Sequence, residues 1–398
     1  MRGVARTAGW AAAGAVVAFG ACEDGGGADR HLVVVRLTEA EAAYAESFAV
    51  VRTVRELDDG RVLVADPLGH VVVRLDLDAG TADTVGSVGE GPAEYRQPDA
   101  VWPLPGGRTL LVDLGNGRLT VLEPELEFGE TRPYAMGDVT QGELVMALPH
   151  AVDGRGRLYF RDLSGMGSGA DSAEVLRLDL DSEALDPVGR VKLPDVTRRE
   201  SGGPNNRNIQ VTQVPLSPAD AWGVAGDGRL VVARAGDYHM DWIAEDGSVT
   251  GGPPVPYEPV RIGAAEKREW RDLQSESGGG LGVEVGIANG AVSVRVSRGG
   301  ASQDDDEALE RHPWPEVKPA FFGGTVPVLV DGRGRAWVRR HREAGKLPRY
   351  DVFGGSGERE VAVELPAGRR VAGFGDGGLY AVRMDAHGRQ FLERYRLP

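Results

Sequence analysis

Six charged residues recur at one place in a repeated sequence pattern and could together bind a charged ligand. Each of them follows a turn glycine by six residues. They are Asp66, Asp113, Asp162, Arg234, Arg340 and Arg383. If the repeats close into a ring, these side chains form a ring that is acidic on one half and basic on the other. The arginines could then hold an anionic group and the aspartates a cation. Alternatively, each side chain caps the turn that follows its own strand, as aspartate often does.

The glycines that precede these residues mark a repeat of one tight turn and one buried strand. Each copy has a glycine turn, four or five apolar residues and then a charged residue, as in 59–66 and 227–234. The glycine supplies a positive φ, and the β-branched run fills a strand that is buried on both faces. The turn glycines stand at 60, 107, 156, 228, 334 and 377. Three of the five spacings lie between 43 and 49 residues, the length of a four-stranded propeller blade.

Six copies predict an all-β fold, a six-bladed β-propeller that occupies residues 31–398. A second strand follows each copy, for example at 71–77 and 349–353. A propeller closes when the two ends of the chain share a blade, which leaves few exposed sheet edges. The apolar segment 31–37 has no other blade to join. We therefore predict that 31–37 completes the blade whose last strand ends at Leu397, so that N- and C-terminal strands pair.

The first two blades carry a more specific pattern. The loop 86–95 is followed by Pro98, and the next strand ends in the turn Asp113-Leu114-Gly115-Asn116-Gly117-Arg118. This order resembles the NHL repeat, which implies a propeller blade with an aspartate-capped turn. In the wider sense the chain is similar to the six-bladed propeller lipoproteins of bacteria.

The first residues indicate export and a lipid anchor. Arg2 and Arg6 precede an apolar run, 8–21, that is too short to span a bilayer comfortably. The run ends Phe19-Gly20-Ala21-Cys22, which resembles the bacterial lipobox. The resemblance implies a signal peptide at 1–21, lipid on Cys22 as the membrane partner, and a place in the cell envelope that faces the periplasm or the exterior. Cys22 is the single cysteine, so no internal disulfide can form. Residues 22–30 are polar and glycine-rich, as in a flexible tether.

Charge limits the partners. The whole chain has a net charge of −15, and loss of 1–21 removes two arginines and no acid, which leaves −17. A protein this acidic repels nucleic acid, so no nucleic-acid partner is expected. The seven histidines do not pair at metal-ligand spacing, and no nucleophile motif appears. No cofactor is therefore predicted, although a divalent cation is compatible with the aspartates, and we expect a monomer.

Two long segments interrupt the repeat. The larger covers about 257–318, where 263–273 favours a short helix, 283–294 a hairpin and 303–307 a solvated loop. Trp270 and Trp314 lie in it and are candidate contact residues if they are exposed. The smaller, 196–215, is polar. Long insertions in a compact fold are often functional.

The leading hypothesis is a surface-tethered interaction module that binds a protein or a glycan at the propeller face or the insertion. The alternative is a metal-dependent lactonase- or lyase-like enzyme with a site in the central channel, whose ligands would come from strands far apart in sequence. A purely structural envelope protein is a third reading. Fold alone does not choose among them.

Overall fold

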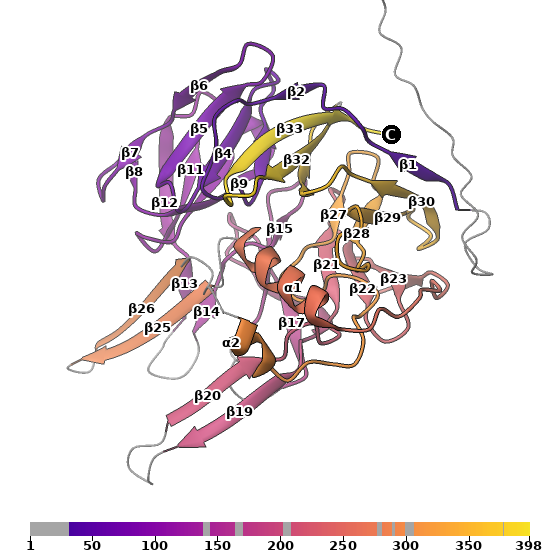
Figure 1. Ribbon diagram of the computed structural model, residues 1–398. Helices are drawn as coiled ribbons and strands as arrows, with labels where there is room; N and C mark the ends of the chain where they lie inside the picture. Colours follow the sequence, from indigo (N-terminus) through magenta and orange to yellow (C-terminus); the bar gives the residue numbers. More distant parts are fainter. Residues whose placement is uncertain are drawn as a thin grey trace, which may run out of the picture.

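A computed structural model describes residues 32–137, 144–163, 170–201, 208–276, 281–288, 291–298, 306–376 and 378–398. Six sheets of four or five strands surround one axis, as the blades of a propeller (Figure 1). The predicted six-bladed fold is therefore confirmed. The predicted signal peptide 1–21, Cys22 and the tether 22–30 lie outside the described residues, as does Gly377.

The first three blades follow one another along the chain, and in each the strands run from the axis outwards in sequence order. Blade 1 has β3 (Val54–Glu56), β4 (Val62–Asp66), β5 (Val71–Asp76) and β6 (Thr81–Thr84). Blade 2 has β9 (Pro98–Pro103), β10 (Thr109–Asp113), β11 (Arg118–Leu122) and β12 (Phe128–Pro133). Blade 3 has β15 (Ala151–Val152), β16 (Leu158–Arg161), β17 (Ser172–Leu178) and β18 (Leu185–Lys192).

The last three blades repeat this order. Blade 4 has β21 (Ala221–Val224), β22 (Leu230–Arg234), β23 (His239–Ile243) and β24 (Val249–Gly251). Blade 5 has β27 (Leu329–Val330), β28 (Ala336–Arg339), β29 (Arg349–Phe353) and β30 (Arg359–Glu364). Blade 6 has β31 (Arg369–Phe374), β32 (Gly378–Met384) and β33 (Gln390–Arg396). The five turn glycines that the structure describes have positive φ, for example 81° at Gly60 and 91° at Gly228, as the repeat predicts.

The N-terminal residues close the ring, but not with the strand that the sequence indicated. The prediction that 31–37 joins the last blade is wrong, because β1 (Val34–Arg36) pairs in parallel with β30 at the outer edge of blade 5. Blade 6 is instead completed by β2 (Ala42–Ala43), which pairs with β33. N- and C-terminal strands thus pair as expected. The apolar pattern of 31–37 marked a strand without specifying its neighbour, and a two-residue strand has no pattern to detect.

Six hydrophobic clusters hold the blades together, one between each pair of neighbours. In blade 1, Val62 and Val64 pack toward blade 6, whereas Leu63 and Ala65 pack toward blade 2. Successive side chains of a strand point to opposite faces, so a second strand between two blades must be apolar at every position. This explains the unbroken apolar runs of the repeat.

The connections between blades form additional elements on one side of the ring (Figure 1). The helix predicted at 263–273 is confirmed as α1 (Ala264–Glu276), and the hairpin as β25 (Leu281–Ala288) and β26 (Ala291–Arg298). The predicted loop 303–307 is wrong at its end, because Asp306 and Glu307 open α2 (Asp306–Glu310), where acidic residues suit a helix N-terminus.

Three more strand pairs lie outside the blades. They are β7 (Ser87–Val88) with β8 (Glu94–Tyr95), β13 (Ala135–Met136) with β14 (Val145–Met146), and β19 (Val196–Ser201) with β20 (Asn208–Gln213). The polar segment 196–215 is thus largely a hairpin. Within the described part of the chain, no helix has both the length and the apolar character that crossing a membrane requires.

Candidate functional site

The two faces of the ring differ in what they carry. The turn glycines lie on one face, called here the opposite face. On the other, the second strand of each blade ends, and α1 lies across it (Figure 1). We call this the helix-bearing face. The six charged residues predicted as a ligand ring stand within one residue of the ends of β4, β10, β16, β22, β28 and β32, so the topology places them all on the helix-bearing face.

Two aspartates of the predicted ligand ring, Asp66 and Asp113, bind backbone amides. Asp66 accepts hydrogen bonds from Leu68 and Gly69 in the turn after β4, and from Ala49 and Val50 in the approach to β3. Buried carboxylates are stabilised when backbone N–H groups donate to them. Asp66 thereby fixes the turn and the start of the blade's innermost strand.

Asp113 does the same in blade 2. Its Oδ1 accepts from the amides of Arg96 and Gln97, at 3.2 and 3.0 Å, and from Asn116. Asn116 and Arg118 then donate to carbonyls of the loop 89–94, including Arg118 to Glu94 at 2.6 Å. The turn that resembles an NHL motif therefore ties this loop to the blade. In blade 3, Asp162 follows β16 and its amide donates to Glu174 in β17.

The arginines of the ring pair with carboxylates of their own blades. Arg234 contacts Asp241 at 2.7 Å and Asp220 at 3.0 Å. Arg340 contacts Asp351 at 2.7 Å, and Arg383 contacts Glu393 at 3.0 Å.

These pairs explain why the ring changes sign halfway round. Blades 4, 5 and 6 carry the arginines of the ring. In each of them, a carboxylate on the third strand lies opposite the second-strand residue that comes two positions before the arginine. The register pairs are Val232 with Asp241, Val338 with Asp351 and Ala381 with Glu393. The same place in the aspartate blades holds Val73, Thr120 and Leu176. Arginine thus occurs where its own blade supplies a counter-charge.

The end of α1 is bound close to the axis of the ring. The carboxylate Oε2 of Glu276 lies 2.9 Å from Nη1 of Arg339, and both side chains are about one-tenth exposed. Its backbone carbonyl accepts hydrogen bonds from Nε2 of Gln390 at 3.0 Å and from Arg370 at 3.3 Å. These partners lie near the ends of strands of blades 5 and 6, so α1 is anchored over those two blades.

Acidic residues along α1 bind the loop between β28 and β29. Glu266 accepts from the amide of Ala344, and Glu269 from that of Gly345. Glu269 also pairs at 2.7 Å with Lys318, which is almost completely buried. A groove of about 450 Å³ remains between α1, this loop and Met384.

The rest of the face, at blades 1 to 4, carries a second group of polar side chains. The ring of His150 stacks on Trp222 with centroids 4.2 Å apart, and Nε2 donates to the Trp222 carbonyl at 3.0 Å. Burial, with smaller contributions from the guanidinium groups of Arg52 and Arg161, lowers the pKa of His150 to about 4. Arg52 pairs with Asp99 of blade 2. Burial alone lowers the pKa of Arg161.

The two predicted contact tryptophans pack against each other. Trp270 in α1 and Trp314 meet edge to face with centroids 5.3 Å apart, and His312 completes the cluster. The indole of Trp314 donates to the Leu309 carbonyl of α2 at 2.7 Å. Both tryptophans are half-buried, and they fasten α1 to α2 within the insertion.

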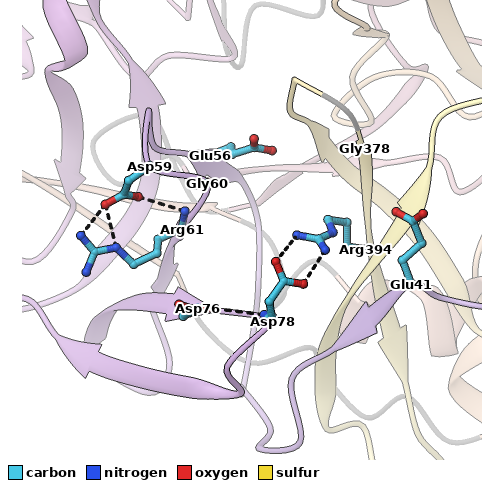
Figure 2. Close-up of a pocket in the computed structure, with 9 residues that line it drawn as sticks. All are labelled: Glu41, Glu56, Asp59, Gly60, Arg61, Asp76, Asp78, Gly378 and Arg394. Carbon is cyan, nitrogen blue, oxygen red and sulfur yellow. Dashed lines mark hydrogen bonds and ion pairs between the residues drawn. The ribbon is translucent and has the colours of Figure 1, made fainter. Parts of the chain in front are cut away.

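A separate hollow lies on the opposite face where blades 1 and 6 meet (Figure 2). It has a volume of about 400 Å³, and five carboxylates and two guanidinium groups line it. Figure 2 shows Asp78 facing Arg394 across the seam, 2.6 Å apart, and Asp59 turned toward Arg61. Glu56 accepts from the Tyr380 hydroxyl at 2.6 Å. These contacts join the first and last blades.

The described residues contain no group of three or more His, Cys, Asp or Glu side chains arranged to hold a metal ion. Sequence reasoning did not find His150, Arg161, Glu276 or Arg339. One signal was present, because Arg161 and Arg339 occupy the same position of the repeat, one residue before Asp162 and Arg340.

The fold defines the class: the chain is a six-bladed β-propeller. No protein-family model matches the sequence, and no curated protein matches it. The structure is similar to virginiamycin B lyase from Staphylococcus aureus, with 11% identity, a TM-score of 0.40, and coverage of 90% of this chain and 99% of that one. It is also similar to a Bacteroides fragilis protein assigned as exported, with 10% identity, a TM-score of 0.44, and coverage of 91% and 94%. A third similar structure is regucalcin from Agrobacterium tumefaciens, a calcium-binding protein, with 10% identity, a TM-score of 0.38, and coverage of 90% of this chain and 94% of that one. The architecture rests on the strand order, and these similarities carry no argument about function.

Proposed function

We propose that the chain is a cell-envelope binding protein, anchored through Cys22, that takes a protein or glycan ligand on the helix-bearing face. The observation that carries this proposal is the docking of α1. Its last residue, Glu276, forms a buried ion pair with Arg339 close to the axis of the ring. The lipobox-like sequence 19–22 supports the anchor.

The ring itself does not need this helix. Six apolar clusters already join the blades, and a buried ion pair adds little net stability because both charges must lose their water. Such pairs are better suited to fixing one orientation of a segment. An insertion that is long, polar and held in one place is typical of a binding element built on a rigid scaffold.

The alternative, a metal-dependent lactonase- or lyase-like enzyme, has no specific observation in its favour among the described residues. The buried carboxylates Asp99, Asp220 and Glu276 on the helix-bearing face each pair with an arginine.

Charge reversal on the two faces tests the binding proposal. Labelled protein 28–398 is applied to a glycan array and to fractionated envelope proteins. Arg268, exposed on α1, is changed to Glu, and Asp246, exposed in the turn after β23 on the opposite face, is changed to Lys. R268E should weaken binding to the ligand found by at least about tenfold, the effect of 1.4 kcal/mol, and D246K should not. The proposal is contradicted if R268E and D246K weaken binding equally, or if neither variant changes the affinity for the ligand.

The anchor has its own test. Cys22→Ser should move the protein from the membrane fraction to the soluble fraction of the cell envelope, because diacylglycerol can no longer be attached. A variant that stays with the membrane contradicts the anchor and leaves the binding face untouched.

A further inference from the structure

We propose that Arg161 anchors an anion-binding subsite on the helix-bearing face, and that it takes a carboxylate group of the ligand. The inference rests on the proposed function, because it names the chemistry of a ligand bound on that face.

Blades 3 and 5 are built alike, which makes their arginines comparable. In blade 3, Asp153 pairs with Arg157 and accepts from the hydroxyl of Tyr159 at 3.0 Å. In blade 5, Asp331 pairs with Arg335 and accepts from the indole of Trp337, also at 3.0 Å. Arg161 comes two residues after Tyr159 in blade 3, and Arg339 comes two residues after Trp337 in blade 5.

The two equivalent arginines differ in one respect. Arg339 has a carboxylate, supplied by Glu276 of the insertion at 2.9 Å. The guanidinium of Arg161 makes no hydrogen bond and no ion pair within the part of the chain that the structure describes, although the residue is half-buried. Burial lowers the pKa of Arg161 and no counter-charge offsets it. An arginine that is partly removed from water without a partner costs stability, and a ligand carboxylate would recover that cost.

The surroundings of Arg161 suit an anion. Arg52 and Arg161 both act electrostatically on His150, so two guanidinium groups lie near one imidazole. His150 donates through Nε2 to the Trp222 carbonyl, and its neutral form leaves Nδ1 as an acceptor for a ligand hydroxyl. Asp99 pairs with Arg52, which leaves the guanidinium of Arg161 to bind a ligand anion. A guanidinium fork matches a planar carboxylate with two parallel hydrogen bonds.

Binding of small carboxylates to protein 28–398 tests the subsite. The probes are glucuronate and N-acetylglutamate as carboxylates, inorganic phosphate as a tetrahedral anion, and glucose as a neutral control. Titration calorimetry compares wild type with Arg161→Gln and Arg161→Lys. The matched control is Arg155→Gln, which removes the same charge from an exposed arginine of the same blade on the opposite face.

We expect at least one carboxylate to bind, with affinity lowered tenfold or more in R161Q, lowered less in R161K and unchanged in R155Q. Tighter binding of glucuronate would identify a sugar acid, and tighter binding of N-acetylglutamate an acidic peptide. The subsite is refuted if no carboxylate binds, if phosphate or glucose binds as well as the carboxylates, or if R155Q weakens binding as much as R161Q.

A second measurement does not depend on a ligand. Because Arg161 lacks a partner, R161Q should melt at or above the wild-type temperature, whereas R339Q should melt below it. Equal destabilisation by both substitutions would show that Arg161 is already paired and would overturn the inference. If no carboxylate binds but R268E still weakens ligand binding, the subsite fails and the proposed binding face stands.

Discussion

The carboxylate of Glu276 lies 2.9 Å from the guanidinium of Arg339 and joins the end of α1 to blade 5. Burial disfavours the charged form of Arg339, but Glu276 outweighs this and holds the pKa of Arg339 above its ordinary value. The pair therefore stabilises the docked position of the helix.

Replacing one member of this ion pair should destabilise the protein more than replacing both members. Glu276→Gln leaves Arg339 buried without a counter-charge, and we expect a loss of about 3 kcal/mol in the free energy of unfolding. The double variant E276Q/R339Q should recover most of that loss. Urea denaturation of the four proteins in the cycle measures the coupling. A double variant as unstable as the sum of the single ones would show that the two residues do not interact.

Truncation at the N-terminus should separate the roles of β1 and β2. A chain that begins at Glu39 loses β1, an extra strand at the edge of blade 5, and should melt a few degrees lower. A chain that begins at Val50 also loses β2 and the buried Tyr44 and Phe48, which pack between blades 1 and 6. It should lose cooperative unfolding, because the ring cannot close. Similar thermal transitions for the two truncated chains would contradict this account of closure.

His150 should make stability depend on pH between about 4 and 6.5. Its pKa is about 4 in the folded protein, mainly through burial, and ordinarily about 6.5 when unfolded. The unfolded state therefore binds a proton first as the pH falls. The stabilisation is complete above pH 6.5 and declines toward pH 4 by about 3 kcal/mol at most. His150→Gln should lack this component in urea denaturation at pH 7 and pH 4.5. A wild type and variant with parallel pH profiles would contradict the shift.

Asp351 should make the stability depend on pH in a more acidic range than His150 does. Burial raises its pKa, but Arg340 and Arg359 outweigh burial and hold the pKa below its ordinary value. The ion pairs contribute stability above the unfolded pKa of about 4, and this is lost as the pH falls through the folded pKa. Asp351→Asn should cost about 3–5 kcal/mol at pH 7, because two arginines lose their ion pair with Asp351.

The difference between D351N and wild type should narrow as the pH falls below about 4. Exposed Glu358 provides the matched control, since Glu358→Gln should unfold like wild type at each pH. A constant difference from pH 7 to pH 3 would show that Asp351 is not ionised in the folded protein.

Most of the fold could be predicted because each second strand buries both of its faces. Val62 to Ala65 must be apolar at every position, since alternate residues pack against different neighbouring blades. The glycine turn before each second strand gave the number of blades. The closing strand could not be assigned, since Ala42 and Ala43 are too few to show a pattern.

The site was less predictable, because its contacts join residues far apart in the chain. Arg339 and Arg340 are adjacent and both basic, yet one binds Glu276 of the insertion and the other binds Asp351 of its own blade. Nothing local distinguishes them. The six ring positions were found because they repeat. His150 and Arg161 belong to the same blade, but His150 meets Trp222 only when blades 3 and 4 come together.

Site-specific photo-crosslinking tests the central claim, that the helix-bearing face is the binding face. A photoreactive residue is placed at position 268 on α1, or at position 246 in the turn after β23, and the full-length chain is irradiated in cell-envelope preparations. The account predicts a discrete crosslinked species from position 268 and none from position 246. Crosslinks from position 246 alone would place the ligand on the opposite face and contradict the account.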